Sequence, residues 1–198
     1  MLERVRSKVS GITEDIGLKL ARLGLKADYV SAMGIFLSAF TFYTLYKGYV
    51  RVSGLLILAS GFLDMIDGAI ARATNTASEK GSFMDSVFDR VSDGLILLGM
   101  GFPVEDFLMS ALAIHSSMMV SYVRAKAESL GVKGTEFSLA GRPERMIIAS
   151  LACLTNRLEL GLFLIALLSY ITVGERSYSA LTKIRLKGPA EGKKATNR

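Results

Sequence analysis

Six uncharged stretches constrain the fold of this sequence more than any other feature. They cover residues 29–46, 52–63, 94–104, 107–123, 146–156 and 160–174. A helix needs about 20 mostly apolar residues to cross about 30 Å of hydrocarbon. The first and fourth stretches approach that length, and the others reach it when charged residues at one end are included. The alternative, a soluble helical bundle, would leave too little polar surface in 198 residues to cover six such stretches.

The pattern predicts an all-α integral membrane protein with six transmembrane helices. Their expected ranges are 27–47, 51–73, 81–101, 104–129, 142–156 and 158–182. Of the 24 Lys and Arg residues, all but four lie in the segments on one side of this topology, the exceptions being Lys47, Arg51, Arg90 and Arg157. Cytoplasmic segments of membrane proteins carry such an excess. We therefore expect a multi-pass protein of the cell (plasma) membrane, with the site and both termini facing the cytoplasm.

The two ends of the chain have different patterns. In residues 1–25, apolar side chains recur every three or four positions among Lys and Arg, which is typical of an amphipathic helix at a membrane interface. An ordinary surface helix of the bundle is the alternative. Residues 184–198 are basic, and we expect a disordered tail there. The membrane domain then covers residues 26–183.

Aspartates interrupt the second and third predicted helices, where an ionisable group costs at least about 2.5–3.5 kcal/mol. Asp64 and Asp67 share one helix face, and Asp85 and Asp89 share another. The short connection predicts that these helices are antiparallel neighbours, with both acidic faces near their cytoplasmic ends. Facing carboxylates repel one another unless a divalent cation binds them, and all-oxygen ligands favour Mg²⁺, Mn²⁺ or Ca²⁺ over zinc. The alternative is structural ion pairing with Arg72, Lys80 and Arg90.

Small residues share these acidic faces. Gly68, Ala71 and Gly81 would leave a slot beside the carboxylates, and Arg72 and Lys80 would line it with positive charge. A metal site with a cationic rim is suited to holding a pyrophosphate and stabilising a leaving phosphate. The residues alone therefore indicate a metal-dependent membrane enzyme of phosphoryl transfer.

The segment from Asp64 to Asp89 resembles the signature of the CDP-alcohol phosphotransferases. All eight fixed positions are present at the family's spacing: Asp64, Asp67, Gly68, Ala71, Arg72, Gly81, Asp85 and Asp89. The resemblance implies six transmembrane helices after an interfacial helix, a homodimer, and displacement of CMP from a CDP-lipid by an alcohol. It implies that Asp64, Asp67, Asp85 and Asp89 ligate a pair of Mg²⁺ or Mn²⁺ ions, with Asp89 also a candidate general base. It assigns CDP binding to Asp64, Asp67, Gly68, Ala71, Arg72, Gly81 and Asp85.

A further resemblance concerns the acceptor. Residues 121–128 and 141–145 are similar to the branch of phosphatidylinositol-phosphate and archaetidylinositol-phosphate synthases, which uses inositol phosphate. Such an acceptor carries its own phosphate, which guanidinium groups bind through paired hydrogen bonds. We expect that phosphate to be bound by Arg124, Arg142, Arg145 and Arg176. Membrane topology alone is the alternative reason for these arginines, and Arg124 stands where the branch often has Lys.

The predicted function is transfer of the phospholipid moiety of CDP-archaeol or CDP-diacylglycerol to inositol 1-phosphate, with release of CMP. Glycerol 3-phosphate is the alternative acceptor, and a cation transporter is the alternative of another class. The lipid bilayer is an expected partner, and nucleic acid is not.

The roles of two further residues are less defined. We expect Asp93 to pair with Arg90 or Lys126, or to tune the site, and His115 to be a packed histidine bonded to a backbone or hydroxyl oxygen.

Overall fold

The computed structural model describes residues 19, 27–74, 78–132 and 139–187, without the side chains of residues 27, 28, 72, 73, 186 and 187. Within these ranges the chain is all-helical, as predicted. The six helices are α2 (Ala27–Tyr46), α3 (Val50–Ala73), α4 (Glu79–Gly101), α5 (Phe107–Ser129), α6 (Arg142–Leu154) and α7 (Leu158–Lys187). The predicted interfacial helix over residues 1–25 lies outside the described residues, apart from residue 19.

The helix bounds agree with the expected ranges to within a few residues, and the differences have local causes. The helix α4 begins at Glu79 because the Ser78 side chain caps it, accepting a hydrogen bond from the backbone N–H of Gly81. The helix α5 begins after Asp106, whose side chain accepts from the N–H of Met109. The last helix continues to Lys187, so residues 184–187, which were assigned to the tail, are helical.

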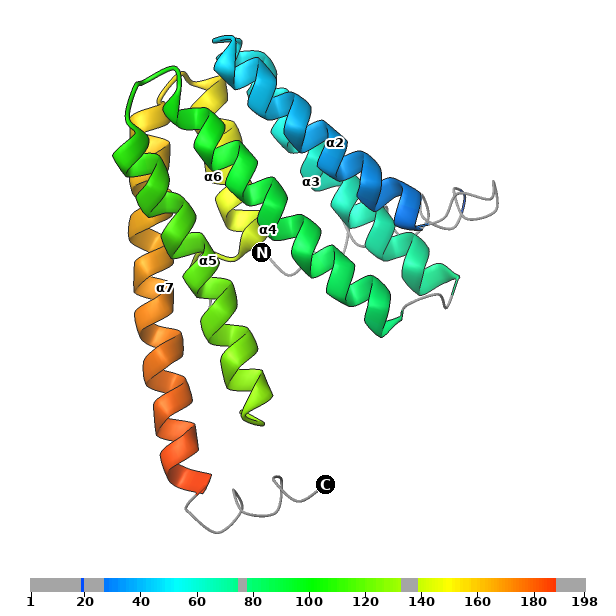
Figure 1. Cartoon of the computed structure of the whole chain (residues 1–198), viewed down its shortest axis with the longest axis vertical. Helices are drawn as coiled ribbons and strands as arrows, with labels where there is room; N and C mark the ends of the chain where they lie inside the picture. The colour runs from blue at the N-terminus through cyan, green and yellow to red at the C-terminus, as the bar shows by residue number, and fades with distance from the viewer. Residues whose placement is uncertain (1–18, 20–26, 75–77, 133–138, 188–198) are drawn as a thin grey trace, which may run out of the picture.

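The helices form two arms that diverge toward one end of the molecule (Figure 1). Helices α2, α3 and α4 make one arm, with α2 packed against both of the others. Helices α5 and α7 make the second arm, and α6 packs against α3 and α7. The arms converge where residues 102–106 connect α4 to α5. The largest core cluster lies there, with Leu45, Ile57, Leu97, Met100 and Leu162 fully buried.

The helices α3 and α4 run antiparallel, as expected, but they are not direct neighbours along their lengths (Figure 1). Among the described residues, α3 packs closely against α2 and α6, and α4 packs closely against α2 and also contacts α5. Glycines explain this arrangement. A Cβ on Gly99 of α4 would lie 2.9 Å from Leu45 of α2, and one on Gly54 of α3 would lie 2.9 Å from Leu154 of α6. The predicted meeting of the two acidic faces is confirmed at Asp64, Asp67 and Asp85. Along the rest of their lengths the two helices are separated, because α2 and α6 occupy the close-approach faces.

The surface of the bundle has the apolar character of a membrane protein. In the described part of the chain, three helices are long and apolar enough to cross a bilayer: Tyr29–Tyr46, Val50–Ala71 and Leu158–Arg185. Large apolar side chains stay exposed on every long helix, among them Phe36, Leu55, Phe83, Leu108 and Phe163. The shortest helix, α6, has 13 residues, which at about 1.5 Å per residue is less than the thickness of a bilayer core. Exposure of this extent favours a lipid environment over water.

Candidate active site

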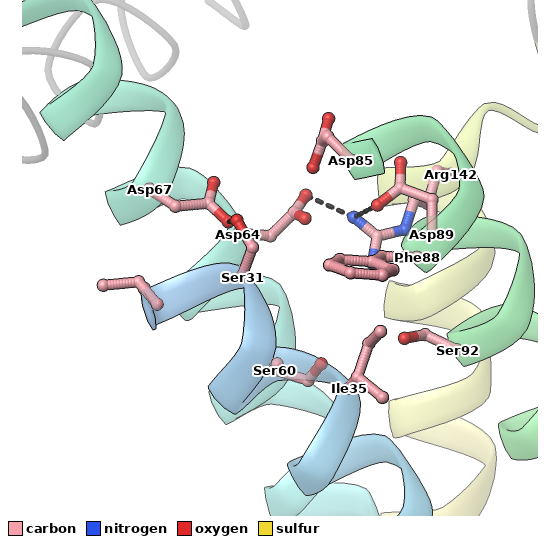
Figure 2. Close-up of a pocket in the computed structure, with 12 residues that line it drawn as sticks. Ser31, Ile35, Ser60, Asp64, Asp67, Asp85, Phe88, Asp89, Ser92 and Arg142 are labelled. Atoms are coloured by element: carbon pink, nitrogen blue, oxygen red, sulfur yellow. Dashed lines mark hydrogen bonds and ion pairs between the residues drawn. The ribbon is translucent and has the colours of Figure 1, made fainter. Parts of the chain in front are cut away.

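Three carboxylates converge where the end of α3 meets the beginning of α4. Asp64 and Asp67 come from α3 and Asp85 from α4, and one oxygen of each lies within 4.8 Å of the others. Figure 2 shows the three side chains turned toward a common point. Carboxylate oxygens are the ligands that Mg²⁺ and Mn²⁺ prefer. The donor set present here therefore fits such an ion.

The backbone explains why these side chains meet. Asp64 and Asp67 are separated by three residues on α3 and so point to one side. The cap at Ser78 fixes the first turn of α4, and Asp85 follows within two turns. The N–H of Gly81 donates to Ser78 Oγ at 3.0 Å, and a Cβ on Gly81 would lie 3.2 Å from that oxygen. This glycine thus has a role in the helix start as well as in the expected slot.

Helix α2 contributes a residue that the sequence did not single out. The hydroxyl of Ser31 donates to Asp67 Oδ2 at 2.7 Å, so it orients one of the three carboxylates (Figure 2). Gly34 and Ile35 of the same helix line the pocket beside it. Ser31 lies in an uncharged stretch where nothing in the spacing distinguishes it from a packing serine.

The fourth aspartate of the motif has cationic partners. Asp89 lies outside the group of three and forms ion pairs with Arg142 Nη1 at 2.8 Å and Arg90 Nη1 at 3.7 Å. The same Nη1 of Arg142 also contacts Asp64 Oδ2, so the guanidinium lies between α3 and α4 (Figure 2). An arginine from the first turn of α6 thereby joins the carboxylate cluster to the fourth acid.

Asp93 has partners other than those expected. It is 2% exposed, and its Oδ2 accepts from Arg145 Nη2 at 2.5 Å. Arg142 Nε lies 3.4 Å from its other oxygen. The expectation that Asp93 pairs with Arg90 or Lys126 is therefore wrong, because this turn of α4 faces α6. Two of the four arginines that were predicted to bind the acceptor phosphate, Arg142 and Arg145, thus lie beside one buried carboxylate.

The other predicted phosphate ligands differ in burial. Arg145 is 3% exposed, and its Nη1 donates to the carbonyl of Ala140 at 2.7 Å. Arg176 is 6% exposed, and its Nη1 donates to the carbonyl of Val120 at 3.0 Å. Arg124 is exposed and pairs with Glu128 one turn along α5 at 2.8 Å. Arg142 forms ion pairs with the motif aspartates Asp64 and Asp89.

The remaining predicted residues have simpler surroundings. Gly68 and Ala71 are half-buried on α3, and Lys80 is exposed in the first turn of α4. The side chain of Arg72 lies outside the described part of the chain. His115 Nδ1 lies 2.9 Å from the hydroxyl of Tyr170, which confirms the expected bond, although the imidazole is exposed on α5 rather than enclosed.

Comparison with known proteins identifies the family of this sequence. Residues 25–182 match the model of the CDP-alcohol phosphatidyltransferase family. The chain is 36% identical over 187 residues to the archaetidylinositol phosphate synthase of Pyrococcus horikoshii, with 94% of this chain and 100% of that protein covered.

Solved structures show the same fold. The crystal structure of Mycobacterium tuberculosis phosphatidylinositol phosphate synthase with CDP-DAG bound has a TM-score of 0.77 and 28% identity, covering 86% of this chain and 94% of that one. The same enzyme in complex with manganese and citrate has a TM-score of 0.76 and 28% identity, covering 86% and 89%. By sequence and by fold, the chain belongs to the CDP-alcohol phosphatidyltransferase family.

Proposed function

We propose that this phosphotransferase moves the phospholipid moiety of a CDP-lipid, CDP-archaeol or CDP-diacylglycerol, to a hydroxyl of inositol 1-phosphate and releases CMP. The observation that carries the proposal is the contact of Arg142 with the acid site, through Asp64 and Asp89. An acceptor that bears its own phosphate needs such a cation beside the reacting centre. The relative from P. horikoshii, an archaetidylinositol phosphate synthase, supports the same acceptor. Family membership makes the protein a transferase rather than the cation transporter considered above.

The metal site of this proposal consists of Asp64, Asp67 and Asp85, with Asp89 beside them. Bound Mg²⁺ or Mn²⁺, in a pair as the resemblance implies, would neutralise charge on the pyrophosphate of the donor. The carboxylates supply oxygen ligands, and Ser31 keeps Asp67 turned toward the others. A manganese complex of the mycobacterial relative supports this choice of metal.

The CDP moiety is assigned to the slot beside the cluster. Gly68, Ala71 and Gly81 have no bulky side chain there, and Arg72 adds positive charge in the sequence. The small residues allow the nucleotide to approach the backbone, and the carboxylates Asp64, Asp67 and Asp85 hold the site of its diphosphate. The donor is then fixed by α3 and α4.

Asp89 is the proposed general base. Its carboxylate accepts the proton of the acceptor hydroxyl as that oxygen attacks the lipid-linked phosphorus. The bond from this phosphorus to the bridging oxygen breaks, and the electron pair leaves with CMP. Arg142 and Arg90 lie 2.8 Å and 3.7 Å from this carboxylate.

The acceptor phosphate does not react, so its role is to supply binding energy that positions the hydroxyl. We assign it to Arg124, Arg142, Arg145 and Arg176. Arg176 lies within electrostatic range of Arg124 and Arg145, and also of Glu128 and Glu144. Arg142 forms ion pairs with the aspartates of the site.

The placement in the membrane is part of the proposal. All six helices cross or enter the bilayer, with the acid site and both termini on the cytoplasmic side, residues 1–25 along the interface and residues after α7 as a basic tail. The opposite end carries exposed Tyr43, Tyr46 and Tyr49, as aromatic residues at a membrane interface do. A homodimer remains a prediction.

An acceptor competition tests the proposed function. Purified protein in lipid nanodiscs receives Mn²⁺, CDP-archaeol or CDP-diacylglycerol, and equal concentrations of inositol 1-phosphate and glycerol 3-phosphate. Mass spectrometry of the lipids and a count of released CMP give the product. The proposal expects a phosphoinositol-phosphate lipid and equimolar CMP. A phosphatidylglycerol-phosphate type product would replace the proposed acceptor with the alternative.

A further inference from the structure

Two arginines from one helix share a single buried carboxylate behind the acid site. Arg142 and Arg145 lie three residues apart on α6, and both approach Asp93 of α4. Asp93 is 2% exposed and Arg145 is 3% exposed, so this pair lies away from solvent. A charge pair at such depth keeps its geometry only if each group is well bonded. Arg145 has Asp93 on one terminal nitrogen and the carbonyl of Ala140 on the other, while its buried Nε has no hydrogen bond to a described residue.

The contact between Asp93 and Arg142 is incompletely bonded. Asp93 Oδ1 and Arg142 Nε are both buried, and neither has a hydrogen bond to any described residue. They lie 3.4 Å apart, which is just beyond good hydrogen-bond geometry. Arg142 meanwhile directs its Nη1 to Asp64 and Asp89. A small movement of this guanidinium toward Asp93 would give both orphaned atoms a partner.

The proposed reaction of the CDP-lipid gives a reason for such a movement of Arg142. Asp64 and Asp89 are the groups that the proposed function assigns to the metal site and to the base. When they engage those ligands, Arg142 loses its two carboxylate contacts in the site. Asp93 lies outside the three-carboxylate group and offers a free oxygen at 3.4 Å. The arginine then stays beside Arg145 instead of swinging into solvent.

We propose that Asp93 is a positioning residue for the acceptor: it holds Arg142 and Arg145 side by side so that their guanidinium groups face the phosphate of the acceptor. The inference rests on the proposed function. Asp93 touches neither the acceptor nor the reacting atoms, and acts through the two arginines. The negative charge of Asp93 offsets one of the two arginine charges, so that the two guanidinium groups can lie close together where they are buried.

The test compares Asp93→Asn with wild type and with Glu159→Gln, a control that removes one exposed carboxylate from the first turn of α7. Initial rates are measured against inositol 1-phosphate and CDP-lipid in turn, and binding of inositol 1-phosphate is measured by calorimetry. The inference expects Asp93→Asn to raise the KM and Kd for inositol 1-phosphate about tenfold or more, from the loss of a charged partner. The Kd for CDP-lipid should change less than twofold, and Asp93→Glu should give an intermediate KM.

A folded Asp93→Asn protein whose acceptor KM and Kd stay within twofold of wild type would overturn the inference. If that variant does not fold, Asp93→Asn combined with Arg145→Met leaves no unpaired buried charge of this pair. Its acceptor KM is compared with that of Arg145→Met alone, because loss of Arg145 is itself expected to raise this KM. The double variant should have the higher acceptor KM with unchanged CDP-lipid affinity, because Arg142 also loses its positioning partner, and equal KM values would overturn the inference.

Failure of the proposed function has a different signature. Wild type would then give product from glycerol 3-phosphate and none from inositol 1-phosphate. The same variants are in that case compared with glycerol 3-phosphate, which also bears a phosphate, and the same thresholds decide. A wild type that uses inositol 1-phosphate together with an unaffected Asp93→Asn variant would remove the inference and leave the function standing.

Discussion

The two ends of α3 and α4 differ in composition and in packing. Toward the converging end of the bundle these helices are apolar, and Gly54 and Gly99 let α6 and α2 approach closely. Toward the other end they carry aspartates, and Arg142 of α6 forms an ion pair with one aspartate of each helix. The close packing of the apolar half fixes the positions of the two helices. Those fixed positions hold the aspartates of the acidic half close together despite their like charges. Changes in the two halves should therefore have different consequences.

The largest effect is expected in the acidic half. Asp64→Asn or Asp67→Asn should abolish turnover and weaken Mn²⁺ binding together, because each removes a charged ligand from the three-carboxylate cluster. Calorimetric titration of Mn²⁺ and a CMP-release assay measure the two properties. Unchanged metal binding and turnover in both variants would contradict the assignment of the cluster.

Asp89→Asn separates the base from the metal cluster. The substitution keeps the shape of the side chain but removes its ability to accept a proton, so turnover should fall about 100-fold or more. Binding of CDP-lipid should persist, because Asp64, Asp67 and Asp85 are intact. Single-turnover kinetics at saturating substrates check this prediction. A variant that keeps more than half of the wild-type rate would remove Asp89 from the role of base.

Arg142→Ala tests the cation that joins the two acidic helices. Loss of a charged hydrogen-bond partner should raise the KM for inositol phosphate about tenfold or more, while CDP-lipid affinity should barely change. Arg142→Lys should recover only part, since an ammonium cannot make the forked contact. If the variants weaken the donor instead, Arg142 belongs to the CDP-lipid site.

The packed half should respond in stability and not in specificity. Gly99→Val places side-chain atoms against Leu45 and the backbone of Phe42, and should lower the free energy of unfolding by about 1–3 kcal/mol. Gly174→Ala is the matched control, because a Cβ there meets nothing within 4 Å. Thermal unfolding in detergent measures both. An altered acceptor KM in folded Gly99→Val would break the division between the two halves.

The smallest effect is expected from Ser31→Ala. The variant removes the 2.7 Å hydrogen bond to Asp67 and leaves the carboxylate in place. A bond of this kind contributes about 1.5–3 kcal/mol at most and less when water replaces it, so Mn²⁺ affinity should fall only a few-fold. Titration of Mn²⁺ into wild type and variant compares them. A loss as large as that of Asp67→Asn would mean that Ser31 itself ligates the ion.

Local pattern predicted much of this molecule. Apolar stretches predicted the helices, and the spacing of Asp64, Asp67 and Asp85 placed them on faces that meet, because both follow from helix geometry. Long-range packing was less accessible. A short connection suggested that α3 and α4 pack together, yet Gly99 and Gly54 give their close contacts to α2 and α6.

The partners of buried charges were equally hidden in the sequence. Asp93 pairs with Arg145, which is 52 residues away, and no spacing rule selects that partner over Arg90 or Lys126. Ser31 is 36 residues from Asp67 and carries no charge that would have drawn attention to it. The two pairings depend on which face α2 turns toward α3 and which face α6 turns toward α4, and that depends on the packing of the whole bundle.

The most direct test of the account is the position of bound manganese. Crystals of wild-type protein grown with Mn²⁺ and CDP-lipid give an anomalous difference map at the manganese absorption edge. The account predicts a peak within about 2.0–2.5 Å of carboxylate oxygens from Asp64, Asp67 and Asp85, with Arg142 displaced toward Asp93. A peak at other residues, or no peak at this cluster in crystals of active enzyme, would contradict the central claim that these aspartates form the metal centre of the transfer reaction.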